Sequence, residues 1–513
     1  MKRIANFLIL LLTGASLLAQ QLPKEVLEYR NVIKSKDIKL FSKKAKDLRY
    51  FMMKNDPHYP TYHFTGVEGS INDPNGPIFY KGQYHIFYQC DPQVEDGEGG
   101  WTKSHRTWGH AVSKDLVHWN DWPIPMWPGK EYDINIFSGN TFIDKNGDLC
   151  AIYTGTVSGS IPTVITTGVL ARSKDEGLTF TKKVVMTNDQ RPNPGSPVHW
   201  DAQTWYHEGL WYQLIGGATE GDNPQGAAWI WTSKDLENWT LQKNIAPSIK
   251  YCTYWELPYL IKLDRRYVLF AGCGNVYWIG NFDYQTLTFT PDDPLPQSAD
   301  NGNYYSFNLN MTDNKGENGN HRQLMHGWIV NHPGSPRFKG LYALSEGDNV
   351  PFWLGAHTIP RVINIKDNRL YQTPIPEIKS LRRKHYHFEN PTTDELGKIK
   401  GEALEIQMKV SLNDQSKFIF NIRCSSENKE QTTIVIDKKN GFFGIDDKKQ
   451  NVKFNEYTYE VRVFIDRSVV EVFIDGYAMT RATFSDPGNY NIKTDCISSI
   501  HTLDIWKMGS IWK

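Results

Sequence analysis

The sequence predicts an all-β protein in which a five-bladed β-propeller precedes a C-terminal β-sandwich. The first observation behind this prediction is a repeat, in which a short apolar strand, a turn and a second apolar strand recur five times. The five units begin at INDPNGPIFY, IFSGNTFI, HWDAQTWY, YWELPYLI and YYSFNLNM. A unit that recurs about every 50 to 65 residues, with room for about four strands, is typical of a propeller blade.

A Ser-Lys-Asp tripeptide supports the same architecture because it recurs in phase with these units. The three copies start at Ser113, Ser173 and Ser233, at intervals of 60 residues, and each follows a strand-like run. An aromatic residue follows each copy within a few positions. Because short polar residues of this kind favour turns, we expect the tripeptide to connect the third and the outermost strand of a blade.

The C-terminal part alternates apolar and polar residues with a period of two, which is typical of half-buried strands. The alternating segments are ALEIQMKV, KFIFNIR, TTIVID, YEVRVFID, SVVEVFID and HTLDIWKM. Six or more short strands separated by Asp, Asn and Gly turns indicate a β-sandwich. The segments contain no cluster of acids or histidines, so we expect a structural role, with carbohydrate binding as the alternative.

These patterns divide the chain into four parts. A leader, a charged and weakly helical N-terminal arm, the propeller and the sandwich domain occupy residues 1–19, 20–57, 58–380 and 381–513. We expect the arm to pack against the propeller. The polar segment 381–402 shows no clean period, which places the last domain boundary at its start.

The first residues predict export. Lys2 and Arg3 precede an apolar run from Ile4 to Leu18, which is typical of a signal peptide cleaved near Ala19. This run is too short for a spanning helix, and no later stretch approaches the ~20 apolar residues that such a helix needs. We therefore expect a secreted or periplasmic protein without a membrane span.

Charge and cysteine content exclude several classes of function. Lys plus Arg and Asp plus Glu number 57 each, so the formal net charge is zero and no nucleic-acid partner is indicated. The six cysteines are widely spaced and none lies in a Cys/His cluster with zinc spacing, so we expect no metal site and no cofactor. Export permits disulfides, but we expect isolated buried thiols, with a Cys252–Cys273 bridge as the alternative.

Three of the five units open with an acid, namely Asp73, Asp201 and Glu256. Because the first strands of propeller blades line one central channel, we expect these carboxylates to meet there. Taken alone, Asp73 would be a turn residue, Glu256 a buried acid paired with an arginine, and Asp201 a link between blades. Together they indicate a retaining glycosidase, which needs an ionised nucleophile within about 5–5.5 Å of a protonated acid. Asp73 suits the first role, and apolar neighbours suit Glu256 for the second.

The ordered motifs INDPNG, YHIFYQCDP, WGHAVSKDLVHW, FSGN and WELP resemble those of glycoside hydrolase family 32, the invertases, inulinases and levanases. The C-terminal VFIDRSVVEVFIDG is similar to the sandwich module of that family. The resemblance spans about residues 58–513 and implies retaining hydrolysis of β-fructofuranosides. It also implies Asp73 as nucleophile, Glu256 as acid/base and Asp201 as transition-state stabiliser. The positions that match a fructose-binding subsite are Asn72, Gln89, Phe137 and Ser138, with Trp108 near it.

The chain departs from the family pattern where the substrate is held. The family usually has Trp-Met, Cys and Arg where this chain has Ser70-Ile71, Leu257 and Trp200. An indole has one donor and cannot replace the guanidinium fork that normally binds two sugar hydroxyls. We therefore expect Trp200 to cover an apolar sugar face, and Arg191 or His199 to supply some of the missing polar contacts.

These observations predict an exported glycosidase that releases terminal β-linked furanosyl units from oligo- or polysaccharides by double displacement. Fructose is the sugar that we expect it to release. Three alternatives remain open. The first is a furanosidase that acts on arabinofuranosides or galactofuranosides, the second is a fructosyltransferase, and the third is a non-catalytic glycan-binding propeller. The presence of all three acids argues against the third, since glycan binding alone does not need both a nucleophile and a proton donor.

Overall fold

The structure is a computed structural model and describes most of the chain. The described residues are 22–97, 101–129, 131–158, 165–192, 199–219, 221, 223–247, 252–302, 305–316, 319–330, 352–413, 416–425 and 431–512. The predicted leader of residues 1–19 lies outside them. Within the described residues the chain is mostly β, as expected, with a few short helices.

Five sheets follow one another along the chain, and their first strands fall in or directly after the starts of the five predicted units. Sheet one contains, in spatial order, β24 (Trp353–Leu354), β1 (Gly69–Pro74), β3 (Gln83–Cys90), β6 (Thr107–Ser113) and β7 (Trp119–Met126), with β2 (Ile78–Tyr80) paired to β3. Sheet two contains β8 (Asn135–Ile143), β9 (Leu149–Ser158), β10 (Ile165–Ser173) and β11 (Thr181–Met186). Sheet three contains β12 (His199–His207), β13 (Leu210–Ala218), β14 (Gly226–Ser233) and β15 (Thr240–Asn244).

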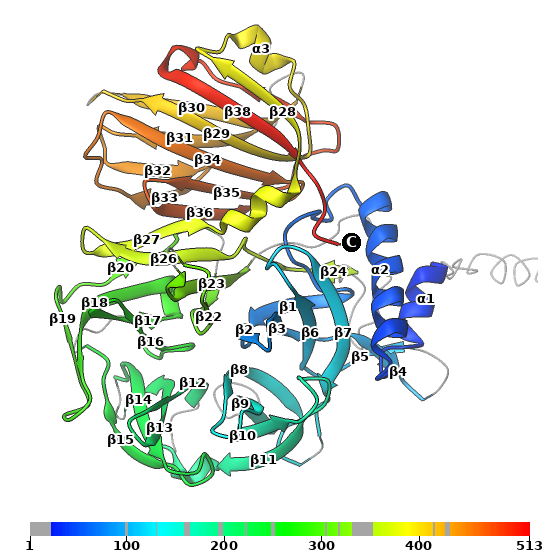
Figure 1. Cartoon of the computed structure of the whole chain (residues 1–513), viewed down its shortest axis with the longest axis vertical. Coiled ribbons are helices and arrows are strands. Elements are labelled where there is room, and N and C mark those ends of the chain that lie inside the picture. Colours follow the sequence, from blue (N-terminus) through cyan, green and yellow to red (C-terminus); the bar gives the residue numbers. More distant parts are fainter. Residues whose placement is uncertain are drawn as a thin grey trace, which may run out of the picture.

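The remaining two of these sheets repeat the pattern. Sheet four contains β16 (Tyr259–Leu263), β17 (Arg266–Ala271), β18 (Val276–Asp283) and β19 (Thr288–Pro291), with β20 (Gln297–Ser298) paired to β18. Sheet five contains β21 (Tyr305–Asn308), β23 (Arg322–Ile329), β26 (Arg361–Lys366) and β27 (Arg369–Pro374), with β22 (Thr312–Asp313) and β25 (Ala356–His357) paired to β23. A small hairpin joins β4 (Gln93–Glu95) to β5 (Trp101–Lys103). Figure 1 shows the five sheets in a ring, with β1, β8, β12 and β16 toward its middle.

The three Ser-Lys-Asp tripeptides lie where the sequence predicts them, between the third and fourth strands of sheets one to three. The serine hydroxyl of each copy donates to the aspartate two residues later, at 3.1, 2.8 and 3.0 Å. The aspartate in turn accepts bonds from backbone N–H groups that follow it, as from His118 at 2.7 Å. The same local hydrogen bonds therefore close all three turns, which explains the repeat.

Two further sheets form the C-terminal domain. The first contains β28 (Arg382–Glu389), β38 (Ile500–Met508), β29 (Ala403–Ser411), β34 (Thr458–Asp466), β35 (Val469–Ile474) and β36 (Tyr477–Ala482). The second contains β33 (Lys448–Asn451), β32 (Phe442–Ile445), β31 (Thr432–Asp437), β30 (Lys417–Cys424) and β37 (Asn491–Lys493). One apolar cluster contains Ile406 and Val463 from the first sheet together with Phe420 from the second. This arrangement is compatible with the predicted sandwich.

The segment 381–402 differs from the prediction that it is irregular. It contains strand β28 and the helix α3 (Thr393–Gly397). Tyr386 and Phe388 pack against the core of the domain, whereas His385, His387 and Glu389 are exposed. The alternation is thus present, but the many polar residues of this edge strand hide it from a reading of hydropathy alone.

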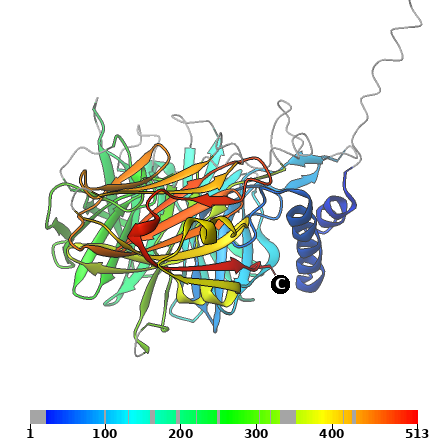
Figure 2. The same ribbon diagram turned by 90° about the horizontal axis from the view of Figure 1, so that it is seen from above.

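Two helices, α1 (Lys24–Arg30) and α2 (Ile38–Asn55), form the N-terminal arm, and Figures 1 and 2 show them on the outer side of sheet one. Leu48 of α2 belongs to one apolar cluster with Ile124 of β7 and Trp353 of β24. The buried Arg49 donates to both carboxylate oxygens of Asp121, at 2.7 and 2.8 Å. The helical arm and its packing are as the sequence predicts. Among the described helices, none has the length and apolarity to cross a membrane.

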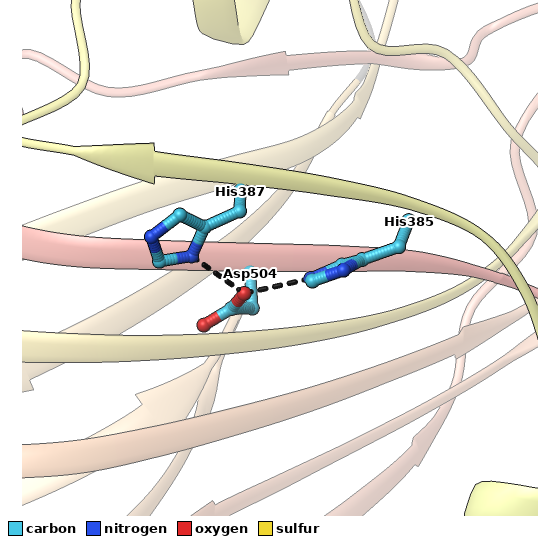
Figure 3. Close-up of side chains that lie close together, drawn as sticks. All are labelled: His385, His387 and Asp504. Atoms are coloured by element: carbon cyan, nitrogen blue, oxygen red, sulfur yellow. Dashed lines mark hydrogen bonds and ion pairs between the residues drawn. The ribbon is translucent and has the colours of Figure 1, made fainter.

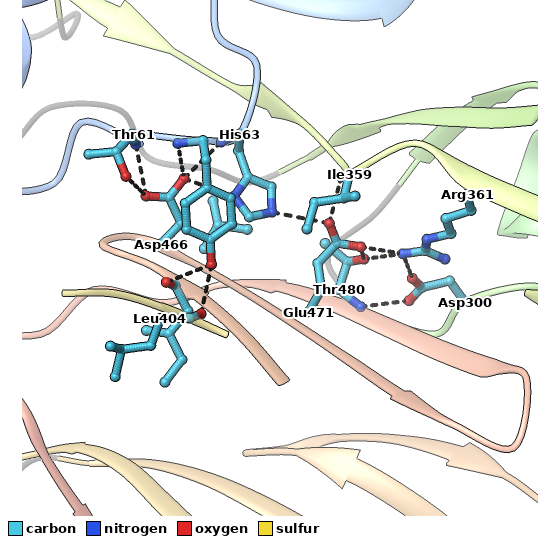
Figure 4. A network of polar contacts seen from close by, with 12 residues as sticks. Thr61, His63, Asp300, Ile359, Arg361, Leu404, Asp466, Glu471 and Thr480 are labelled. Carbon is cyan, nitrogen blue, oxygen red and sulfur yellow. Dashed lines mark hydrogen bonds and ion pairs between the residues drawn. The ribbon is translucent and has the colours of Figure 1, made fainter. Parts of the chain in front are cut away.

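A buried network of charges joins the ring of sheets to the C-terminal domain (Figure 4). Asp466 of β34 accepts bonds from three consecutive backbone N–H groups ending at His63. The His63 ring lies between two carboxylates, with Nδ1 3.0 Å from Asp466 and Nε2 3.1 Å from Glu471. Arg361 of β26 donates to Glu471 at 2.8 Å and to Asp300 at 2.9 Å. These alternating charges hold segments from three parts of the chain in one arrangement.

Candidate active site

The first strands of four sheets are irregular at the same point, near the middle of the ring. The pairing register shifts within β1, β8, β12 and β21, between Ile71 and Pro74, Ile136 and Gly139, Trp200 and Ala202, and Tyr305 and Phe307. Such bulges re-aim the side chains that lie within them. The residues inside the four bulges are Asn72 and Asp73, Phe137 and Ser138, Asp201, and Ser306. Most of the predicted site residues thus lie in one kind of bulge, which recurs from sheet to sheet.

Asp73 is held by a chain of polar contacts from two neighbouring sheets. Ser138 Oγ donates to Asp73 Oδ2 at 2.5 Å, and the amide of Gln89 donates to the same hydroxyl. Burial raises the pKa of Asp73, whereas hydrogen bonding to Ser138 and Ser306 and the charge of Arg106 lower it. Burial outweighs these partners, so the pKa of Asp73 is raised from its usual value.

Asp201 is buried and has a left-handed backbone, with φ of 60°. Its own N–H donates to Thr154 Oγ1 at 3.1 Å, which fixes the bulge against sheet two. Burial raises the pKa of Asp201 well above its usual value, the charges of Glu256 and Asp73 raise it further, and the N–H of Leu257 opposes them. Asp201 thus lies close enough to both Glu256 and Asp73 for their charges to raise its pKa.

Glu256 lies in the loop before β16, so the predicted strand begins three residues later than the sequence suggests. The backbone of this loop is anchored on both sides. The N–H of Trp255 donates to the carbonyl of Gly217 at 2.9 Å, and the carbonyl of Glu256 accepts from Gly272 at 2.9 Å. In a loop, the direction of the long Glu256 side chain is not set by the alternation of a strand. The two backbone hydrogen bonds fix the position of the Glu256 main chain.

A disulfide between Cys252 and Cys273 closes the same loop. Cys273 begins the short 3-10 helix η2 (Cys273–Asn275), which directly precedes β18. The bridge therefore ties the start of the Glu256 loop to the body of sheet four. The expectation of isolated buried thiols is therefore wrong for this pair of cysteines.

The predicted sugar-binding residues surround the acids but do not all face the same way. Asn72 Oδ1 accepts from Arg106 at 3.1 Å, and the Asn72 carbonyl lies 2.7 Å from His357 Nε2. Trp108 is fully buried and its indole N–H donates to the carbonyl of Phe137 at 2.9 Å. In this structure the buried Trp108 therefore stabilises the backbone of β8.

Two residues that sequence reasoning missed belong to the site. Arg106 donates to Ser70 Oγ at 2.9 Å and to Asn72, and it is the cation that acts on Asp73. Arg106 lies between β5 and β6 and carries no motif, so nothing in the sequence marked it. Ser306 starts the fifth unit, and its equivalence to Asp201 was the signal that could have identified it.

Trp200, predicted to contact substrate, pairs through its backbone with Gly216, and its side chain lies outside the described part of the structure. The same holds for the side chain of His199. Arg191 is described and buried, and together with Thr154 and Asp201 it lines a cavity of about 20 Å³. Arg191 thus lies near Asp201, on the side toward sheet two.

The chain resembles known proteins along most of its length. It matches the model of the Glycosyl hydrolases family 32 N-terminal domain over residues 63–374 and that of the C-terminal domain over residues 377–507. It is 26% identical to a sucrose-6-phosphate hydrolase of Zymomonas mobilis, across 94% of this chain and 96% of that protein. It is 30% identical to a levanase of Bacillus subtilis, across 84% of this chain and 66% of the levanase. The solved structure of a sucrose-6-phosphate hydrolase from Lactobacillus gasseri has the same fold, with a TM-score of 0.74, 23% identity, and coverage of 96% of this chain and 100% of that one.

Proposed function

The chain belongs to glycosyl hydrolase family 32 and is a glycoside hydrolase of the fructosidase type, and we propose that it is an exported, retaining enzyme that releases terminal β-linked fructosyl units. The observation that carries this proposal is the convergence of Asp73, Asp201 and Glu256 at the middle of the ring. Two carboxyl groups of different protonation, with a third that binds sugar hydroxyls, are what double displacement at a furanoside requires.

The five sheets act in this proposal as the blades of a five-bladed propeller. Adjacent first strands touch, since β1 contacts β21 and β8 contacts β12. β24, which follows β23 of sheet five in sequence, pairs in parallel with β1 through Gly69 and Trp353. This exchange of a strand between the last and the first sheet supports a closed ring, which would keep the acids at a fixed separation.

The proposed mechanism follows from the surroundings of each acid. Ser138 donates a hydrogen bond to Asp73 and the charge of Arg106 favours its ionised form, so Asp73 is the acid that attacks the anomeric carbon and forms the covalent fructosyl intermediate as the leaving oxygen departs. Glu256 donates its proton to the departing oxygen and then removes a proton from the water that attacks the intermediate. Asp201 is the hydrogen-bond partner of the fructosyl hydroxyls, and its bulge presents the carboxyl to the sugar.

The Cys252–Cys273 disulfide supports the proposed export, because structural disulfides form in oxidising compartments. Together with the predicted leader it favours a secreted or periplasmic enzyme. The replacement of the family arginine by Trp200 favours a substrate other than sucrose. We therefore propose a differently linked fructan or another furanoside as the preferred substrate, with weak activity on sucrose.

A panel of sucrose, inulin, levan, aryl β-fructofuranosides and aryl arabinofuranosides tests this function. The expected result is release of free fructose from a fructan or aryl fructoside, with sucrose clearly slower. NMR of the first-formed sugar should show the anomeric configuration of the substrate, as double displacement demands. Initial release of the inverted anomer would exclude the mechanism. Efficient turnover of an arabinofuranoside only, or accumulation of longer oligosaccharides in place of free fructose, would favour one of the two enzymatic alternatives.

A further inference from the structure

The C-terminal domain carries a cluster of two histidines and one aspartate on an exposed sheet face (Figure 3). Their strands, β28 and β38, lie apart from β1, β8 and β12 (Figure 1). His385 Nε2 lies 2.7 Å from Asp504 Oδ1, and His387 Nδ1 lies 2.8 Å from the same oxygen. These three atoms all lie within 4.8 Å of one another. Two imidazole nitrogens and a carboxylate oxygen, converging on one point, form the donor set that zinc and similar ions favour.

The strands fix this geometry. His385 and His387 are two residues apart on β28, so their side chains share one face, and His387 stands directly opposite Asp504 of β38. The ring of His385 stacks on Trp506, with centroids 4.6 Å apart and planes at 7°. Because the backbone register and an aromatic contact already orient the ligands, little conformational freedom would be lost on binding an ion.

The surroundings of His387 point to a metal ligand rather than to a simple ion pair. While Nδ1 faces Asp504, the other ring nitrogen, Nε2, lies 3.1 Å from Glu389. A histidine that binds a metal through one nitrogen usually donates its other N–H to a carboxylate, which fixes the tautomer and raises the basicity of the ligand. Glu389 is two residues further along the same face of β28 and supplies that carboxylate.

We propose that His385, His387 and Asp504 bind a divalent transition-metal ion such as Zn²⁺ through Nε2, Nδ1 and Oδ1, with solvent completing the coordination. The ion would replace the protons that the two imidazoles now share with Asp504, and these protons would leave to solvent. Ligand atoms about 2.1 Å from a tetrahedral ion are about 3.4 Å apart, so each nitrogen would move away from Asp504 Oδ1 by less than about 1 Å. The side chains are 44%, 48% and 24% exposed, which leaves them room for this movement.

The position of the site suggests what bound metal would do. β28 is the edge strand of its sheet and follows the 3-10 helix η4 (Pro376–Leu381), which leads from sheet five into the C-terminal domain. An ion shared between β28 and β38 would clip this edge strand to its neighbour. It would stabilise the C-terminal domain without touching Asp73 or Glu256. The sequence predicts no such site because Asp504 is 117 residues from His387.

Zn²⁺ binding to the full chain, made without a histidine tag, tests the proposal by calorimetry and by competition with a chromophoric chelator. We expect one site per chain. His387→Ala and Asp504→Asn should weaken binding at least tenfold, and Glu389→Gln should weaken it roughly tenfold as the orienting carboxylate. His501→Ala is the matched control, since His501 is an exposed histidine of the same strand β38 that bonds to Ser411 outside the cluster. The Zn²⁺ affinity of His501→Ala should equal that of the unchanged protein.

Thermal unfolding gives a second readout, because an ion that binds only the folded chain raises Tm, and the rise grows with the logarithm of the ion concentration above Kd. Zn²⁺ should raise the Tm of the unchanged protein and of His501→Ala, but not that of His387→Ala. The circular dichroism of each variant before addition of metal controls for folding. Absence of stoichiometric binding by the unchanged protein, or equal affinity of His387→Ala, would show that the three side chains form a hydrogen-bonded cluster only. Fructosidase activity does not enter either readout, so the two proposals stand or fall separately.

Discussion

Two groups of buried acids in this molecule behave in opposite ways. Burial raises the pKa values of Asp73 and Asp201 at the middle of the ring, whereas those of Asp466 and Glu471 at the domain junction are lowered. The junction acids face the cations His63 and Arg361, which more than offset desolvation. At the middle of the ring the charge of Arg106 is too weak to offset the burial of Asp73, and Asp201 faces the charges of Glu256 and Asp73. Burial alone therefore does not decide the charge of a carboxyl, and the acids whose burial is not offset by cations are the ones suited to exchange protons.

Asp300 is an intermediate case that sharpens this comparison. It shares Arg361 with Glu471, yet burial outweighs the cation and the pKa of Asp300 is raised. By contrast, Glu471 faces both Arg361 and His63, and its pKa falls to about 2. One shared cation is thus too little to compensate two buried carboxyl groups, and the second cation makes the difference.

The largest expected effect is the loss of turnover in Asp73→Ala. Because the covalent step has no other nucleophile, kcat should fall roughly 10³-fold or more. The urea midpoint of unfolding should stay unchanged or rise, because the variant removes a buried carboxyl whose ionisation burial opposes. Activity above a few per cent of the unchanged enzyme on its best substrate would contradict the assignment of Asp73.

Glu256→Gln should be almost as severe on natural substrates and much milder on activated ones. A leaving group such as nitrophenolate needs no proton, so the first step should survive while the second loses its base. The rates of the variant and of the unchanged enzyme, measured on an aryl fructoside and on a fructan, give the loss of activity on each substrate. An equal loss on both substrates would argue against Glu256 as the proton donor.

Asp466→Asn should show the reverse pattern, with a loss of stability and normal turnover per folded molecule. The variant leaves His63 buried beside a neutral amide, and breaking a buried ion pair in this way costs about 3–5 kcal/mol of unfolding free energy. Urea unfolding at constant pH measures this cost. Glu237→Gln is the matched control, because its partner Lys183 is 60% exposed and such a surface pair contributes about 1 kcal/mol or less.

The pH dependence of the free energy of unfolding should follow the titration of His63 and Glu471 at the domain junction. The pKa of His63 is raised to about 9, so its contribution is complete below pH 6.5 and is lost as pH rises through 9. The pKa of Glu471 is lowered to about 2, so its contribution is present above pH 4.5 and is lost as pH falls toward 2. Stability should therefore be greatest between these limits. His63→Gln should remove most of the decline between pH 6.5 and 9, a difference of about 3 kcal/mol at most.

The smallest expected effect concerns the loop that carries Glu256. In the double variant Cys252→Ser, Cys273→Ser the anchor of this loop is lost, while its backbone bonds to Gly217 and Gly272 remain. We expect kcat to fall about three- to tenfold with little change in KM, because small displacements of a catalytic group slow the reaction. Assays well below the unfolding temperature separate this effect from stability. An unchanged kcat would show that the backbone bonds alone position Glu256.

The sequence by itself determined the repeat and most of what depends on it. The Ser-Lys-Asp turns and the alternation within strands are local patterns, since neighbouring residues form their hydrogen bonds and faces. The equivalent places of Asp73 and Asp201 in their units were enough to predict that they meet. The same reasoning failed for β28, because only Tyr386 and Phe388 mark its apolar face among many polar residues.

Only the tertiary structure decided which charges meet. Arg106 reaches Asp73 from a segment without a motif, and His63 lies beside Asp466 across 403 residues of sequence. The direction of each pKa shift depends on these long-range neighbours and on burial, neither of which has a period in the sequence. The histidine cluster at Asp504 arises in the same way, from the pairing of β28 with β38. Local pattern therefore predicted where the strands and the acids lie, and packing decided how each acid is charged.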